Sequence, residues 1–134
     1  MRAALLLAGL CLLCAPVRAD EASDVQGVIS SQLEAFARDD AQAAYAFAAP
    51  AIREQFDDAA SFLAMVKSAY PAVYRHRSAE FGVEQRDGER VRQAIVFVDA
   101  DNDVWAGVYL LARQPDGAWR IEGCALRRSD DTSL

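Results

Sequence analysis

Residues 91–121 read VRQAIVFVDADNDVWAGVYLLARQPDGAWRI, and this stretch decides the fold. Two runs, Val91 to Val98 and Val104 to Arg113, are rich in the β-branched and aromatic residues that are typical of strands. The polar segment Asp99 to Asp103 separates them, and Pro115-Asp116-Gly117 follows with the proline and glycine that suit a type I turn with a bulge. The stretch therefore predicts successive strands that are joined by short turns, with a further strand beginning at Trp119.

The same pattern extends toward the N-terminus as far as Ser78. Asp87-Gly88 separates Phe81-Gly82-Val83 from the strand that starts at Val91, and an Asp-Gly pair between apolar runs is a strong hairpin signal. Four strands that are connected by short turns predict an antiparallel meander.

Helical signals occupy the chain before Ser78. Ser23-Asp24-Val25-Gln26 is a capping box with serine at the N-cap, and it predicts an amphipathic helix that ends near Arg38. Three further helices are predicted. The first starts at Asp39-Asp40 and stops near Pro50, and the second runs from Pro50 to about Phe56. The third starts at Asp57-Asp58 and stops at Pro71. Short helices followed by a meander predict an α+β fold, with the helices packed on one face of a bent four-stranded sheet.

The first 19 residues have the parts of a secretory signal peptide. Arg2 supplies the positive charge, Ala3 to Cys14 form the apolar core, and Val17-Arg18-Ala19 is a small-residue cleavage site. The apolar core is shorter than the roughly 20 residues that span a bilayer, so no membrane anchor is expected after cleavage. We predict a single α+β domain over residues 20–134, located in the periplasm or secreted.

The net charge and the cysteine content limit which classes of molecule the protein is expected to bind. Loss of Arg2 and Arg18 with the signal peptide leaves 12 basic against 20 acidic side chains, a formal charge of −8. This charge argues against nucleic acid or an anionic membrane as a partner. Cys124 is the one cysteine of the predicted mature chain, so it cannot form an internal disulfide, and its position in a strand suits a buried, inert thiol.

The run from Val104 to Leu111 is apolar on both alternations. One alternation carries Val104, Ala106, Val108 and Leu110, and the other carries Trp105, Gly107, Tyr109 and Leu111. Because helices can cover only one face of the sheet, the second face is expected to meet another subunit, a ligand or the sheet's own curl. A homodimer is one arrangement that would bury it.

Several segments resemble a bacterial family known as domain of unknown function 4864. They are Trp105-x-x-x-Tyr109, Gln114-Pro115-Asp116-Gly117-x-Trp119-Arg120-Ile121-x-Gly123-Cys124-x-Leu126, Phe47-Ala48-Ala49-Pro50-Ala51-Ile52 and Phe62-x-x-Met65-Val66-x-x-x-Tyr70-Pro71. More remotely, short helices followed by a bent sheet resemble the superfamily of nuclear transport factor two, SnoaL-type cyclases and ketosteroid isomerase. This resemblance implies a cone-shaped pocket and frequent dimers, on a fold that hosts enzymes, carriers and assembly modules alike.

Candidate ligand-binding residues are the aromatic side chains expected on the concave side, together with the one histidine. They are Tyr70, Tyr74, His76, Trp105, Tyr109 and Trp119. Aromatic rings more often fill a core than line a pocket, so both interpretations stay open. His76 lies between two arginines in a segment expected to be a loop, where a solvated side chain is the plainer interpretation and a general base the other.

No metal or cofactor site is predicted. Asp99-x-Asp101-x-Asp103 has the alternating carboxylates of a calcium loop, but Val104 stands where that loop needs glycine and Leu110 where it needs glutamate. A hairpin turn is therefore the preferred interpretation. The sequence also lacks a nucleophile elbow, paired cysteines, a zinc motif and a glycine-rich phosphate loop.

Three functions remain after these exclusions. The leading hypothesis is a non-catalytic exported module that binds a small, partly apolar ligand or a protein partner. The alternative is an enzyme of isomerase or cyclase type, in which His76 or Glu122 acts as acid or base and Tyr109 donates a hydrogen bond. A structural homodimer held together through the sheet is the third.

Overall fold

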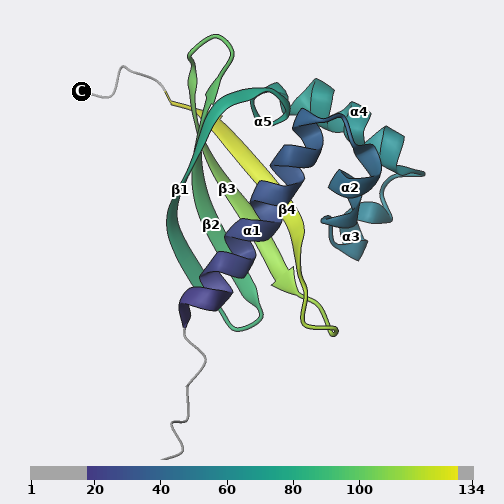
Figure 1. Ribbon diagram of the computed structural model, residues 1–134, viewed down its shortest axis with the longest axis vertical. Coiled ribbons are helices and arrows are strands. Elements are labelled where there is room, and N and C mark those ends of the chain that lie inside the picture. The colour runs from purple at the N-terminus through teal and green to yellow at the C-terminus, as the bar shows by residue number, and fades with distance from the viewer. Residues whose placement is uncertain (1–17, 130–134) are drawn as a thin grey trace, which may run out of the picture.

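Helices occupy the first half of the chain and strands the second in the computed structural model, which describes residues 18–129 (Figure 1). The helices are α1 (Arg18–Ala37), α2 (Ala41–Ala46), α3 (Pro50–Arg53), α4 (Ala59–Ala69) and α5 (Pro71–Tyr74). The strands are β1 (His76–Asp87), β2 (Arg90–Asp99), β3 (Val104–Arg113) and β4 (Trp119–Arg128). The α+β fold that the sequence predicts is confirmed.

The four strands form one antiparallel sheet in the order β1-β2-β3-β4, which is the predicted meander. Asp87 pairs with Arg90, so the first hairpin loop has two residues, and Gly88 adopts a positive φ of 59° there. In the third turn Gly117 has a φ of 88°, and its N–H donates to the carbonyl of Gln114 at 2.8 Å. Glycine tolerates this left-handed conformation because it has no Cβ.

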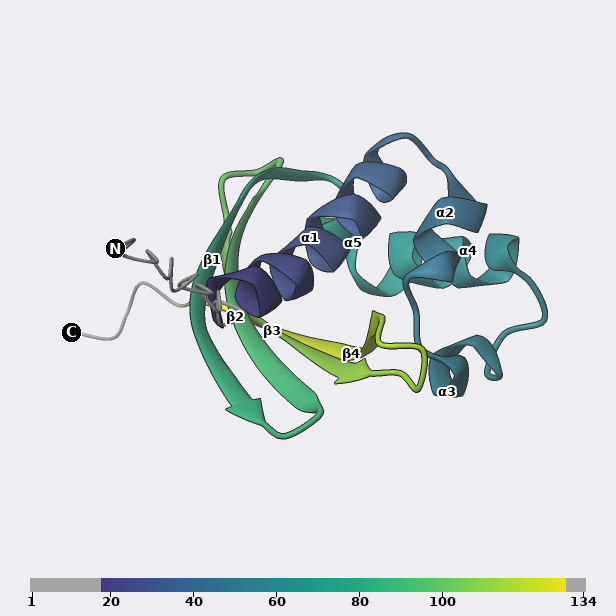
Figure 2. The ribbon, with the colours of Figure 1, turned by 60° about the horizontal axis from the view of Figure 1, so that its bottom comes forward.

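The sheet is strongly curved, and α1 lies across its concave side (Figure 2). A bulge between Phe81 and Glu84 bends β1, and the Gln93 amide nitrogen of β2 donates to the Gly82 carbonyl there at 3.0 Å. Another register shift lies at Leu110 and Leu111, between β3 and β4. Bulges increase local twist and bend the strand that carries them, so they account for much of the curvature.

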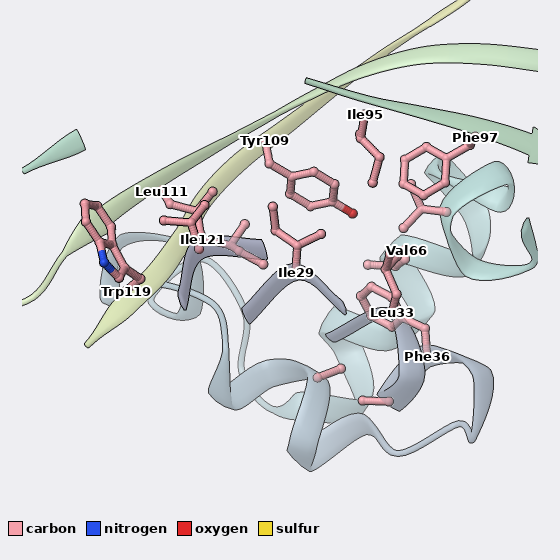
Figure 3. Close-up of a cluster of buried hydrophobic side chains, with 14 of the residues drawn as sticks. Ile29, Leu33, Phe36, Val66, Ile95, Phe97, Tyr109, Leu111, Trp119 and Ile121 are labelled. Carbon is pink, nitrogen blue, oxygen red and sulfur yellow. The ribbon is translucent and has the colours of Figure 1, made fainter. Parts of the chain in front are cut away.

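The hydrophobic core fills the space between α1 and the sheet (Figure 3). Ile29 and Phe36 of α1 meet Phe97 of β2 and Tyr109 of β3, and the helix α4 adds Val66 from the other side. The Tyr109 ring extends from the sheet into this cluster, directly above Ile29 in the view of Figure 3. One continuous core therefore joins the helical and strand halves of the chain.

Two of the predicted helix caps form as expected. Asp40 accepts a hydrogen bond from the Ala43 N–H at 3.1 Å and Asp58 from the Ser61 N–H at 2.8 Å, which starts α2 and α4. Each side chain satisfies a backbone donor that a helix start leaves unpaired.

The predicted N-cap at Ser23 is wrong, because α1 begins at Arg18 and runs through Ser23. Alanine, glutamate and aspartate precede Ser23, and the good helix formers among them let the backbone continue the helix upstream. Helix α3 is shorter than predicted and ends at Arg53. Pro71 ends α4 as expected, but it also begins the short α5, where a proline at the first position needs no N–H partner.

Strand β1 starts two residues before the predicted Ser78 and includes His76, which was expected in a loop. The reason is that β2 extends to Asp99, which pairs with His76. Over the described residues, the helices are too short or too polar to cross a membrane.

Candidate ligand-binding site

A cavity of about 250 Å³ lies between the helical half of the chain and strand β4. Its walls are mainly apolar side chains from α4 and the segment before it, facing β4 and the floor residue Tyr109. They include Phe56, Phe62, Met65, Val66, Ile121 and Cys124. Ligand sites are typically concave and apolar with a few polar groups, and this cavity has that composition.

A local sequence signal positions one wall of the cavity, and pairing between distant segments positions the other. The Asp58 cap fixes the start of α4, so Phe62, Met65 and Val66 follow at helical spacing and turn toward the interior. The opposite wall is fixed by pairing across the chain. The Ala49 N–H donates to the Ile121 carbonyl at 2.7 Å, and the Ile121 N–H donates to the Phe47 carbonyl at 2.8 Å. These two bonds hold the start of α3 against β4.

Polar groups are few in the cavity wall. The Gln32 side chain of α1 is buried, and its amide nitrogen donates to the Ala44 carbonyl at 3.1 Å. Gln55 and Glu122 also line the cavity. Within residues 18–129, Glu122 is the only charged residue in the lining, and its carboxylate lies 3.8 Å from the guanidinium of Arg90, which is outside that lining. The cavity thus offers hydrogen bonds but no cation.

Tyr109 and Cys124 form the polar pair at the base of the cavity. Burial raises the pKa of the Tyr109 hydroxyl well above its ordinary value, and the neighbouring Cys124 raises it further. Burial also raises the pKa of the Cys124 thiol to about 12, although the hydrogen bond with Tyr109 opposes this shift. Both groups stay protonated at neutral pH, so Cys124 lacks the thiolate that nucleophilic chemistry needs.

Tyr70 closes one end of the cavity. It stands between α4 and α5, and its hydroxyl donates to the Cys124 carbonyl at 3.4 Å. Beyond it lies a second depression of about 330 Å³ along β4, lined by Pro71, Trp105 and Leu126 among others. We name the first space the inner cavity and the second the outer groove.

The six candidate residues from the sequence do not gather at one place. Tyr70 and Tyr109 line the inner cavity, while Tyr70 and Trp105 line the outer groove. The Trp105 indole N–H donates to the Asp99 carboxylate at 2.9 Å, which fixes its orientation. Three of the six therefore lie along one slot beside β4.

Tyr74 belongs to a surface cluster instead. Its hydroxyl donates to the Asp39 carboxylate, and the Arg75 guanidinium lies 3.8 Å from its ring centroid while the Lys67 ammonium lies 5.2 Å away. The hydrogen bond from Tyr74 is the main cause that lowers the pKa of Asp39, with both cations adding to it. This cluster ties the end of α1 to α4 and α5.

His76 begins β1 and is not among the residues that line the inner cavity. Its Nδ1 is 3.0 Å from the Val73 carbonyl, and its ring is 5.6 Å from that of Phe97. A shallow groove between α1 and β1 includes His76, Glu34 and Arg77. His76 therefore does not share the space that Tyr70 and Tyr109 line.

Trp119 is a core residue, only 4% exposed, at the end of the cluster opposite Phe97 (Figure 3). The guanidinium groups of Arg86 and Arg113 lie 5.2 Å and 5.1 Å from its ring centroid, a cation–π arrangement. The glycine turn before Trp119 thus serves packing at this end of the sheet.

The carboxylates of Asp99, Asp101 and Asp103 lie within 4.8 Å of one another, as a cation site would require. Their hydrogen bonds are those of a turn. Asp99 accepts from the N–H groups of Asp101 and Asp103, both at 2.9 Å, and Asp103 pairs with Arg128 at 2.7 Å. The Trp105 indole is the largest cause that lowers the pKa of Asp99. These bonds favour the turn interpretation.

Part of the cavity wall was not predicted from the sequence. Phe62, Met65 and Val66 entered through the family resemblance, and Cys124 was interpreted as an inert thiol, so neither was expected beside a cavity. One available signal was Gln32, a polar residue inside the apolar stripe that runs from Ile29 to Phe36. A polar side chain at a buried helical position indicates a partner or a cavity.

Comparisons with known proteins bear on the fold and the family. A crystal structure of an NTF-2 like protein of unknown function from Silicibacter pomeroyi is similar, with a TM-score of 0.60 and 12% sequence identity. The match covers 85% of this chain and all of that one, and it shows a shared fold. No curated protein matches the sequence. The domain of unknown function 4864 matches residues 18–134. This chain belongs to the family of domain of unknown function 4864.

Proposed function

We propose that this protein is an exported module that binds a small, partly apolar ligand in the inner cavity. The observation that carries the proposal is the cavity itself, about 250 Å³ of space between α4 and β4 with an apolar wall. An apolar cavity of about 150 Å³ in another protein holds benzene. The inner cavity can accommodate a larger molecule than that.

The chemistry of the wall favours binding over catalysis. Tyr109 and Cys124 are held protonated by burial, so each offers a neutral hydrogen-bonding group at the base of the cavity. An isomerase would need an acid or base in contact with the ligand, whereas the Glu122 carboxylate lies 3.8 Å from the Arg90 guanidinium, which is outside the cavity lining. His76, the other candidate, lines a different groove.

A cavity-filling variant tests the proposal. Met65 faces the cavity from α4, whereas Ala64 on the same helix is exposed. We expect native mass spectrometry of the protein purified from its own host to show a retained small molecule. Met65→Trp should remove that mass by filling the space, and the matched control Ala64→Trp should keep it. Wild-type protein that carries no ligand and binds no small apolar compound in calorimetric titration would refute the proposal.

The proposal that the protein is exported is supported by its N-terminal sequence, which has Arg2, the apolar run from Ala3 to Cys14 and the small-residue cleavage site. Cleavage before Asp20 would remove two residues from the start of α1 and leave its core residues Val25 and Ile29 in place. Sequencing the N-terminus of protein from a periplasmic fraction tests this. A chain that keeps Met1 in the cytoplasm would contradict it.

A homodimer through the outer face of the sheet is a second proposal. Val96 and Val104 on that face are 42% and 38% exposed, and Ala106 lies beside Val96 on the neighbouring strand. Glu80 and Arg127 flank this apolar centre on β1 and β4. An apolar centre with a charged rim is typical of an interface. Sedimentation velocity measures the mass directly, and a strict monomer would refute this proposal.

A further inference from the structure

The inner cavity and the outer groove meet at two residues. Tyr70 and Cys124 line both spaces, and the hydrogen bond from the Tyr70 hydroxyl to the Cys124 carbonyl runs between them. On one side of this contact lie Met65, Val66 and Tyr109, and on the other lie Trp105 and Leu126. The two spaces are thus successive parts of one slot beside β4, divided by the Tyr70 side chain.

This partition is weakly held. The distance of 3.4 Å is long for a bond between two oxygens, whose usual separation is about 2.8 Å. Tyr70 itself is half-buried and stands at the break between α4 and α5, where its backbone has φ −131° and ψ 56°. Its ring packs against the edge of the core, and its hydroxyl is held by one long hydrogen bond.

The other partner in the contact lies on β4, the terminal strand of the sheet. The Ser129 N–H donates to the Val104 carbonyl, so in this register the backbone groups of Ala125 point toward β3 and those of Cys124 point away from it. The Cys124 carbonyl is consequently available to Tyr70. Opening the contact returns that carbonyl to solvent at the edge of the sheet and breaks no bond between strands.

The charges along the slot define the class of ligand. In the described part of the chain, the outer groove has no ionisable group in its lining other than Tyr70 and Cys124, and the inner cavity adds Tyr109 and Glu122, whose carboxylate is paired with Arg90. A carboxylate or phosphate group on the ligand would find no cation there. A linear, uncharged, mainly apolar chain fits both parts.

We propose that Tyr70 sets the length limit of an uncharged chain-like ligand, by closing the inner cavity against the outer groove. This inference rests on the proposed binding function of the inner cavity. Short chains fit in the inner cavity with Tyr70 in place. Longer chains must displace the ring to reach Trp105 and Leu126, and therefore bind less tightly than their apolar area predicts.

Primary alkanols from butanol to decanol, titrated by calorimetry, test the inference. For the wild type, affinity should rise about fourfold with each methylene until the inner cavity is full, and then stop rising. In Tyr70→Ala the rise should continue to longer alkanols. Tyr70→Phe should keep the wild-type limit because the ring remains. Tyr74→Ala is the matched control, since that ring lies in the surface cluster, and it should also keep the limit.

Two further variants keep the test decisive. Tyr70→Val retains an apolar side chain and carries the comparison if circular dichroism shows that Tyr70→Ala is unfolded. Adding Leu126→Trp to Tyr70→Val should fill the outer groove and restore the short limit. If the wild type binds alkanols and the Tyr70 variants show the same limit, the role of Tyr70 is refuted and the binding function stands. If no alkanol binds to any chain, both proposals fail.

Discussion

At the residue scale, Cys124 connects burial to the pH dependence of stability. Burial raises the thiol pKa from 9.0 to about 12, so the folded chain keeps a proton that the unfolded chain releases above about pH 9. A raised folded-state pKa stabilises the protein fully below the unfolded pKa, and this contribution is lost as pH rises toward the folded one. Alkaline pH should therefore destabilise the protein through this thiol, in addition to the buried Tyr109 hydroxyl, whose pKa is also raised.

We predict that Cys124→Ala flattens the alkaline loss of stability. The wild-type free energy of unfolding should fall by about 1 kcal/mol more than that of the variant between about pH 8 and pH 10. Urea unfolding at several pH values measures the difference, and the comparison cancels groups that titrate equally in both chains. Parallel pH profiles would show that the thiol ionises in the folded protein as readily as in the unfolded one.

Asp57 and Asp58 make a matched pair at the start of α4. The sequence predicts a cap from this pair without choosing between them, and the structure assigns it to Asp58, which accepts from the Ser61 N–H at 2.8 Å. We predict that Asp58→Ala lowers the free energy of unfolding by about 1 kcal/mol, because a helix N–H loses its partner. Asp57→Ala should change it by less than about 0.5 kcal/mol. Equal effects of the two variants in urea unfolding would contradict this assignment.

At the element scale, the bulge of β1 depends on Gln93. The Gln93 side chain is fully buried, and its amide nitrogen donates to the carbonyls of Gly82 and Ala94 at 3.0 Å and 2.9 Å. Gln93→Leu should lower the free energy of unfolding by about 1 kcal/mol, because the carbonyls of Gly82 and Ala94 lose their donor. Gln85→Leu, on the exposed part of β1, is the control and should have little effect. A Gln93 variant as stable as the control would mean that the bulge forms without this bond.

Turns and caps explain why so much of the element order could be predicted. Asp40, Asp58, Gly88 and Gly117 act within a few residues of their own position, so local chemistry determines where those elements start and stop. The prediction was wrong at Ser23, where a capping box lies inside a longer helix. A capping motif indicates that a helix can start at that position. The residues before the motif determine whether the helix has already started upstream.

The candidate site could be predicted only in part, because it depends on contacts between distant elements. The inner cavity exists because β4 binds the segment before α3 through Ile121. No local sequence pattern predicts this pairing. Tyr70 and Tyr109 were selected for their aromatic character, and the fold places both at the cavity. Trp119 was selected on the same grounds and lies in the core between two arginines instead.

At the scale of the whole molecule, the two faces of the sheet have different roles. The concave face is filled by α1 and the core, while the outer face keeps Val96 and Val104 partly exposed. The helices of residues 18–74 lie on the concave side or at the end of the sheet, so they do not cover this outer surface. An apolar centre on a small protein's surface is typical of an interaction site.

Val96→Lys tests whether a second copy covers that surface. Val96 lies opposite Glu80 on β1, so a lysine there has an acidic neighbour and can extend into solvent in a monomer. In a two-fold dimer the lysines of both copies would lie in the apolar centre, where burying a charge without a partner is costly. Sedimentation velocity should then show a dimer for the wild type and a monomer for Val96→Lys.

The matched control is Val83→Lys, at the bulge of β1, where the valine is 71% exposed and lies away from the centre of the sheet. This variant should remain dimeric, because its lysine stays in solvent in either state. Loss of the dimer in both variants would place the contact at the β1 edge, where Val83 lies. Retention in both would place it elsewhere on the molecule. Only dissociation by Val96→Lys alone identifies the outer face of the sheet as the surface through which two copies of this chain associate.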